Sequence, residues 1–178
     1  MNNIKNLTLS ALFLALCMVL PLLTGQIQTL GTMLTPMHFP VFLCALICGW
    51  KYGVIVGFIA PLLRSVLFGM PPLYPTAFAM AFELATYGFV AGWLYERFKA
   101  KKVLGVYIAM VPAMIIGRLV WGLVDAICLG LAGSSLTLSV FISSILISSI
   151  PGIILQLILI PLIMYALDKA HLVCFHQS

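Results

Sequence analysis

Five ionisable side chains interrupt otherwise apolar sequence and are the first candidates for binding chemistry. They are His38, Arg64, Glu83, Arg118 and Asp125. Charged groups within a membrane segment are costly, and they usually face a bundle interior or a water-filled cavity, where they pair or bind a ligand. These residue types therefore predict a site for a small polar molecule inside a membrane protein.

Two of the expected helices carry several of these groups on a single face. The faces follow helical spacing and consist of Thr76, Met80, Glu83 and Tyr87 on one helix, and Arg118, Trp121, Gly122 and Asp125 on the next. Residues with this spacing point in the same direction from a helix. Two such faces together would offer an acid, a base and aromatic rings to one ligand.

Structural roles for the same residues remain open. Arg64 with Glu83, or Arg118 with Asp125, would also make buried pairs whose only task is to neutralise charge. His38 lies between two prolines and is also placed to cap a helix or anchor a loop. Gln156 belongs to a polar stripe with several serines, which fits hydrogen bonding between helices as well as ligand contact.

Motifs for catalysis, nucleotide binding and metal binding are absent from the sequence. It contains no His-Glu-x-x-His zinc motif, no Gly-x-Ser-x-Gly turn and no phosphate-binding glycine loop. Cys44 and Cys48 share a helix face, but no further ligands complete a zinc set. We therefore expect no enzyme activity, no metal and no cofactor on this chain.

The elements that must position these residues are membrane helices. Of 178 residues, 63% are hydrophobic and 7% are charged, and the mean hydropathy is +1.21. About 20 apolar residues cross a bilayer as a helix. The sequence therefore predicts one all-α membrane domain, residues 1–178, built as a compact bundle of six transmembrane helices. We expect them at residues 7–23, 37–48, 52–68, 76–97, 103–131 and 138–167.

The remaining basic residues predict the orientation of this bundle. They lie at the N-terminus, at alternate connections and near the C-terminus: Lys5, Lys51, Arg97, Lys99, Lys101, Lys102 and Lys169. The connections at 24–36, 69–75 and 132–137 contain no lysine or arginine. Cytoplasmic loops are rich in these residues, so both termini are predicted to be cytoplasmic. The net charge of +5 therefore reflects topology and not nucleic-acid binding.

A pair of small residues marks the first helix. Ala11 and Ala15 are separated by three residues, a spacing that lets another helix approach closely. The other helix would belong either to the same bundle or to a partner protein.

Several motifs, taken in order, resemble those of one protein family. They are Ala-Leu-Phe-Leu-Ala at 11–15, Met-His-Phe-Pro-Val at 37–41, Gly-Trp-Lys-Tyr-Gly at 49–53, Gly-Phe at 57–58 and Phe-Glu-Leu-Ala at 82–85. With six compact helices, the whole chain is similar to an S component, the substrate-binding subunit of an energy-coupling-factor (ECF) vitamin importer.

The resemblance implies a multi-pass protein of the bacterial plasma membrane that topples in the membrane during ATP-driven uptake. Ala11 and Ala15 would face a transmembrane T component, which joins two ATPase subunits that use the ATP. The ligand would bind near the outer surface, beneath the loop at 24–36, with contacts from the last three helices. The candidate substrate-binding residues are His38, Arg64, Glu83, Tyr87, Arg118, Trp121, Asp125 and Gln156.

The resemblance also suggests a B vitamin or related micronutrient, with pantothenate as the first candidate. An arginine such as Arg64 would suit the carboxylate of pantothenate. Glu83 and Asp125 would equally suit a ligand with an amine or ring nitrogen. Two other functions remain open: a structural or regulatory membrane protein without a ligand, and a solitary secondary carrier that relays protons through Glu83 or Asp125.

Overall fold

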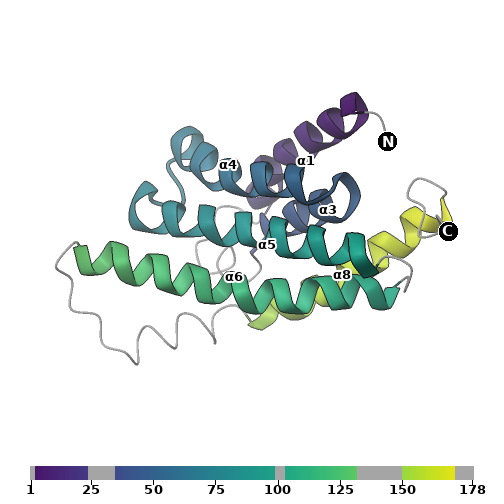
Figure 1. Cartoon of the computed structure of the whole chain (residues 1–178). Helices are drawn as coiled ribbons and strands as arrows, with labels where there is room; N and C mark the ends of the chain where they lie inside the picture. Colours follow the sequence, from purple (N-terminus) through teal and green to yellow (C-terminus); the bar gives the residue numbers. More distant parts are fainter. Residues whose placement is uncertain (1–2, 24–34, 99–102, 132–149, 171–178) are drawn as a thin grey trace.

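The chain forms a helical bundle in the computed structural model, which describes residues 3–23, 35–98, 103–131 and 150–170 (Figure 1). Within these ranges there is no β-strand. The elements are α1 (Asn3–Leu23), α3 (His38–Cys48), α4 (Trp50–Phe68), a kinked turn η1 (Leu73–Ala77), α5 (Phe78–Phe98), α6 (Val103–Leu131) and α8 (Ile150–Lys169). The all-α prediction is therefore confirmed.

Five of these segments are long and apolar enough to cross a membrane. They are Asn3–Leu22, Trp50–Phe68, Leu73–Phe98, Val103–Gly130 and Ile150–Lys169. The predicted second helix is α3, and its 11 residues extend about 16 Å, about half the thickness of the hydrocarbon core. The described part thus contains five candidate spans and one short apolar helix, where the sequence predicted six spans. The predicted start of the last helix, at 138, lies outside the described residues.

Gly49 makes the tight reversal between α3 and α4. Its φ of 95° lies in the region that glycine adopts without steric cost, and α4 begins at the next residue. The sequence predicted a longer break, from 49 to 53. Helical geometry begins earlier because the Gly53 amide donates to the Gly49 carbonyl, with an N–O distance of 3.1 Å.

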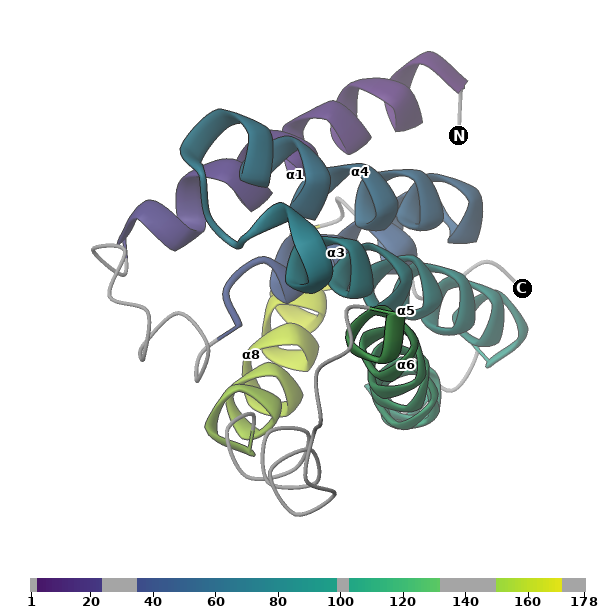
Figure 2. The same cartoon turned by 90° about the vertical axis from the view of Figure 1, so that its left-hand side faces the viewer.

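Glycines bring α4 and α5 into backbone contact. A Cβ atom on Gly57 would lie 2.4 Å from the Leu84 carbonyl oxygen, and one on Gly88 would lie 2.3 Å from the Gly53 carbonyl carbon. Helices with small residues at four-residue spacing pack this closely in membranes. Figure 2 shows the consequence, with α5 between α4 and α6, and α5 also contacts α3.

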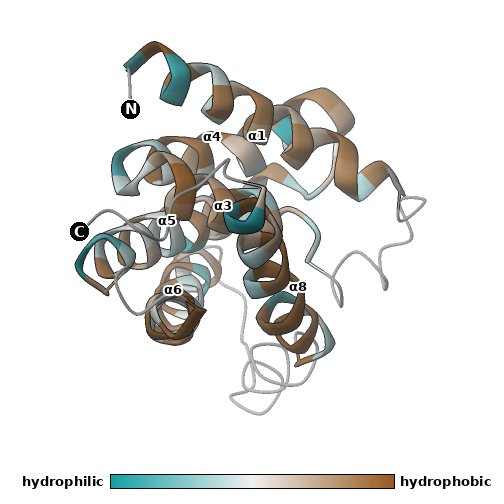
Figure 3. Ribbon diagram, turned by 90° about the vertical axis from the view of Figure 1, so that its right-hand side faces the viewer, coloured by the Kyte–Doolittle hydropathy of each residue, from teal (hydrophilic) through white to brown (hydrophobic). Residues whose placement is uncertain are grey.

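The outer faces of the helices are apolar. Large exposed hydrophobic residues are found on several of them, including Leu12 and Val19 on α1, Leu119 and Leu123 on α6, and Ile158 and Leu162 on α8. Figure 3 shows the hydrophobic colouring of these helices on the outside of the bundle. Soluble monomers rarely expose apolar surface on this scale, so these faces fit lipid.

The helix ends that carry basic residues gather at one end of the bundle. In Figure 1 the start of α1, the start of α4, the end of α5 and the end of α8 all lie on the right-hand side. These ends carry Lys5, Lys51, Arg97 and Lys169 respectively. In the same view α4 and α6 end on the opposite side. That the basic end is cytoplasmic stays a prediction.

Candidate functional site

A buried carboxylate forms the centre of the site. Glu83 of α5 is 1% exposed, and its Oε1 atom lies 3.1 Å from Nη1 of Arg118 on α6. The Tyr87 hydroxyl donates a hydrogen bond to the same oxygen at 2.6 Å. Nε2 of His38, the first residue of α3, lies 3.7 Å away. We call these four residues from three helices the Glu83 cluster.

Local helix geometry explains part of this arrangement. Glu83 and Tyr87 are four residues apart on α5, so their side chains lie one above the other on the same face. His38 reaches the cluster because the chain turns sharply just before α3, where the His38 amide donates to the Thr35 carbonyl at 3.0 Å. The sequence predicted all four residues as ligand-binding candidates, and the structure brings them together.

Gly117 positions the ring of Tyr87. A Cβ atom on Gly117 would lie 2.2 Å from Cε1 of Tyr87, so the ring occupies the space of the missing side chain. The ring also stacks on that of Phe42, with centroids 5.0 Å apart. Sequence reasoning missed Gly117. The available signal was an isolated glycine inside a helix, directly before a charged residue, since such a glycine usually has a packing reason.

Three nitrogen atoms of the cluster have no hydrogen-bond partner among the described residues. They are Nδ1 and Nε2 of His38 and Nε of Arg118. The separation of 3.7 Å between His38 Nε2 and Glu83 is longer than a hydrogen bond. His38 is 2% exposed, so water does not replace the missing partners freely. Buried polar groups are nearly always paired, and exceptions of this kind point to function.

The alternative pairings considered from the sequence are wrong. Arg64 does not neutralise Glu83; its Nη1 donates to the Met18 carbonyl on α1 at 3.0 Å, and its guanidinium lies 5.3 Å from the centre of the Phe68 ring. Arg118 pairs with Glu83 and not with Asp125, because two turns of α6 separate it from that carboxylate. Arg64 therefore lies between α1 and α4, apart from the cluster.

The two other candidates on α6 lie in different surroundings. Trp121 is half-buried, and its ring lies 5.8 Å from the guanidinium carbon of Arg118, so it contacts the cluster through that residue. Asp125 is 9% exposed, and no residue of the described chain pairs with it. One turn further on, the Cys128 carbonyl accepts a hydrogen bond from the Tyr74 hydroxyl, which joins η1 to α6.

Gln156 connects α8 to the entry of α3. Its side-chain amide donates to the Thr35 hydroxyl at 2.7 Å, three residues before His38. In this contact Gln156 supports the position of His38, and a direct role in ligand binding stays a prediction. The predicted loop over the site, at 24–36, lies outside the described residues apart from its last two positions.

Ala11 and Ala15 lie on the exposed face of α1, whereas Ser10, Phe13 and Cys17 face the bundle. Packing within the bundle does not account for the two alanines. Their face is open to lipid or to another protein.

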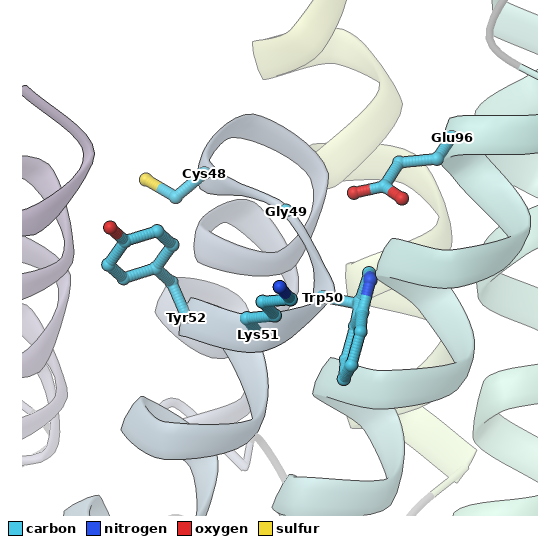
Figure 4. A pocket seen from close by; sticks show the side chains of 6 residues that line it. All are labelled: Cys48, Gly49, Trp50, Lys51, Tyr52 and Glu96. Carbon is cyan, nitrogen blue, oxygen red and sulfur yellow. The ribbon is translucent and has the colours of Figure 1, made fainter. Parts of the chain in front are cut away.

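A separate hollow of about 280 Å³ lies where α3 passes into α4 (Figure 4). It is lined by Cys48, Gly49, Trp50, Lys51, Tyr52 and Glu96. Glu96 is 13 residues after Glu83 on α5, about 20 Å along the helix, so this hollow is distinct from the Glu83 cluster. Neither it nor any other part of the described chain groups three potential metal ligands from His, Cys, Asp and Glu.

Comparison with known proteins identifies the family. The family model described as ECF transporter, substrate-specific component matches residues 5–164. The chain belongs to this family. It is therefore an S component, a part of a transporter and not a member of an enzyme family. Searches of curated proteins and of solved structures found no match.

The matched region contains the whole Glu83 cluster of this S component, together with Ala11 and Ala15. It extends from the first turn of α1 into the second half of α8. The family description fits the helical bundle, whose apolar outer faces and candidate spans indicate a multi-pass membrane protein.

Proposed function

We propose that this S component binds a small vitamin-like molecule at the Glu83 cluster. The observation that carries the proposal is a buried acid, a base and two aromatic or imidazole groups from three helices, with nitrogen atoms left unpaired. Ionisable groups inside a membrane protein typically mark the path or the site of a substrate. The cluster brings together more of the predicted ligand-binding residues than any other place in the described chain.

Charge supports an outward-facing site. Glu83 is in the second turn of α5, near the end of the bundle opposite Lys51 and Arg97. If the basic end is cytoplasmic, the cluster lies in the outer half of the membrane and both termini are cytoplasmic. A ligand then binds from outside a bacterial cell and is released inside after the protein reorients.

The exposed alanines support a partner on α1. Small side chains allow helices to approach closely, and Ala11 and Ala15 present such a surface away from the bundle. We propose that the T component binds there and couples the chain to two ATPase subunits. ATP is consumed by those subunits, and this chain itself uses no cofactor.

Pantothenate is the first vitamin to test. The reason is an arginine able to hold its carboxylate, but both intramembrane arginines already have partners. Arg64 donates to Met18, and Arg118 pairs with Glu83. Neither arginine is therefore left without a partner to hold that carboxylate.

Uptake and binding test the proposal together. Cells that lack their own vitamin uptake are supplied with this chain, a T component and the two ATPases, and accumulation of labelled B vitamins is measured. We expect uptake that is lost when the ATPases are inactivated by mutation. Uptake that persists without ATPase activity contradicts the coupled mechanism. Uptake by liposomes that carry the chain alone, driven by a pH gradient, would instead identify a solitary carrier.

Thermal unfolding of the purified chain with a panel of B vitamins tests binding directly. A ligand at about 100 times its Kd stabilises the folded protein by about 2.7 kcal/mol. We expect one vitamin to raise the unfolding temperature of the unmodified chain and of Glu96→Gln, and to have no effect on Glu83→Ala. Glu96 is the matched control because it is an exposed acid on the same helix. If no vitamin of the panel raises the unfolding temperature, the result would favour a structural protein without a ligand.

A further inference from the structure

The unpaired nitrogens of the Glu83 cluster indicate which ligand atoms would bind there. Nδ1 and Nε2 of His38 and Nε of Arg118 are buried without partners among the described residues. A polar group left unpaired in the interior costs free energy that a hydrogen-bonding ligand would recover. The ligand should therefore present polar atoms to these three nitrogens.

The chemistry of the nitrogens restricts the choice of ligand atoms. The Arg118 Nε atom only donates, whereas a neutral imidazole has one donor and one acceptor. An acceptor oxygen satisfies Arg118, and a group that also carries an N–H or O–H satisfies His38 as well. Amides, imides and ureas combine a carbonyl oxygen with an N–H in this way.

The charge of the cluster separates neutral groups of this kind from carboxylates. The positive charge of Arg118 is already balanced by Glu83, at 3.1 Å. Glu83 Oε1 is held by Arg118 and by the Tyr87 hydroxyl, and His38 Nε2 stays 3.7 Å away, so the short contact of a charged imidazolium is missing. The charges of Arg118 and Glu83 cancel each other, so beside a neutral imidazole the cluster has no net charge. A carboxylate entering it would be buried without a counter-charge, which is strongly unfavourable.

The other intramembrane charges do not change this balance in favour of an anion. Asp125 lies two turns from Arg118 on α6, is buried, and has no cation beside it in the described chain. In its ionised form Asp125 would oppose the approach of another carboxylate, and in its neutral form it would supply no counter-charge. Arg64, the remaining intramembrane cation, donates to Met18 on α1.

From this balance we infer that the group bound at the Glu83 cluster is an uncharged carbonyl-containing group of the amide type, and that the site discriminates against carboxylates. The inference rests on the proposed function, because it assumes that the cluster binds the substrate. Its distinctive expectation concerns closely related compounds. An uncharged vitamin derivative should bind more tightly than the corresponding acid.

Matched pairs of compounds test the inference on the purified full chain. The pairs are panthenol with pantothenate, nicotinamide with nicotinate, and biotinamide with biotin, and the other B vitamins complete the panel. We expect the tightest ligand to be uncharged and to carry a carbonyl group. Where a pair binds, the uncharged member should bind at least about tenfold more tightly than the acid, equivalent to about 1.4 kcal/mol.

The outcomes distinguish this inference from the proposed function. Tighter or equal binding of an acid overturns the inference, and so does a tightest ligand without a carbonyl group, such as thiamine. In both cases a vitamin still binds, so the proposed function stands. If no compound of the panel binds, the proposed function is overturned, and the inference with it.

The substitution Glu83→Gln tests the cause of the selectivity. It removes the counter-charge of Arg118 and should reduce the preference for the uncharged member of a pair by about tenfold or reverse it. The control Glu96→Gln, an exposed position on the same helix, should leave the ratio of the two affinities within about twofold. An unchanged ratio in folded Glu83→Gln overturns the charge argument. If this variant does not fold, the ratio measured on the unmodified chain decides.

Discussion

The two faces of α5 are built in opposite ways. Toward α4, glycines bring the backbones together, and Gly57 and Gly88 leave no room for a side chain. Toward α6, the contact contains Glu83, Tyr87 and Arg118, with a buried ion pair and an unpaired nitrogen, Nε of Arg118. The first face contributes close packing, and the second contributes polar groups at the expense of stability. α5 thus has a close-packed contact on one side and the Glu83 cluster on the other.

The largest expected effect comes from breaking the α4–α5 contact. Gly88→Leu places a side chain where a Cβ atom alone would lie 2.3 Å from the Gly53 backbone. Overpacking typically costs about 1–3 kcal/mol, and more where the obstacle is backbone. We expect about 3 kcal/mol or more, measured as loss of folded protein in detergent. The control is Gly130→Ala, since a Cβ atom on Gly130 meets nothing within 4 Å. Equal stability of the two variants would contradict the packing argument.

Removing one charge of the buried pair should have the next largest effect. Arg118→Leu leaves Glu83 buried without its cation, which typically costs about 3–5 kcal/mol and should also abolish ligand binding. Thermal or denaturant unfolding of the purified variant measures the loss. The double variant Glu83→Leu with Arg118→Leu removes both charges and should recover most of the stability but not the binding. Recovery of both properties would mean that the pair has no part in ligand binding.

A smaller change should follow from loss of the Tyr87 hydroxyl. Tyr87→Phe removes its hydrogen bond to Glu83, at 2.6 Å, and hydrogen bonds to charged groups contribute about 1.5–3 kcal/mol. We expect this loss of stability together with weaker vitamin binding, measured by titration. Tyr165→Phe is the control, because that tyrosine is exposed on α8. Unchanged binding in Tyr87→Phe would place the hydroxyl in a structural role.

The smallest effect on the fold is expected at α1. Ala15→Trp adds a large side chain to an exposed face, so stability should change by no more than about 0.5 kcal/mol. Vitamin binding by the purified chain should be unaffected, but uptake with the T component and ATPases should be lost. Val19→Trp lies one turn beyond Ala15 on the same exposed face. Its effect on uptake would show whether the contact with the T component extends that far along α1. Loss of binding together with uptake would show that Ala15 belongs to the fold.

Much of the architecture could be predicted from the sequence because apolar runs mark membrane helices directly. Five predicted helices match candidate spans, and Glu83 and Tyr87 were placed on one face of α5 by their spacing alone. The second predicted span is the short helix α3, whose expected range in the sequence, 37–48, is already shorter than the roughly 20 residues that cross a bilayer as a helix.

The sequence could not predict which arginine pairs with Glu83. Arg64 and Arg118 are both arginines in apolar helices, and helix spacing says nothing about which neighbouring helix faces which. Helix packing decides which arginine pairs with Glu83, because α5 lies between α4 and α6 and its Glu83 side chain points toward α6. The place of Gly117 under the Tyr87 ring depends on the same packing, so it too appeared only in three dimensions.

The hydrogen bond from Arg64 to the Met18 carbonyl has a mechanical consequence. Met18 lies one turn beyond Ala15 on α1, and Arg64 is anchored in α4, which is in turn locked to α5 by glycine contacts. Force applied to α1 therefore reaches α5, the helix that carries Glu83, through Arg64 and the α4–α5 interface, and it also reaches α3 through the contacts of α1 with that helix. The first helix is fixed to the rest of the molecule by this contact. A protein that binds α1 would therefore tilt the Glu83 cluster together with the whole bundle.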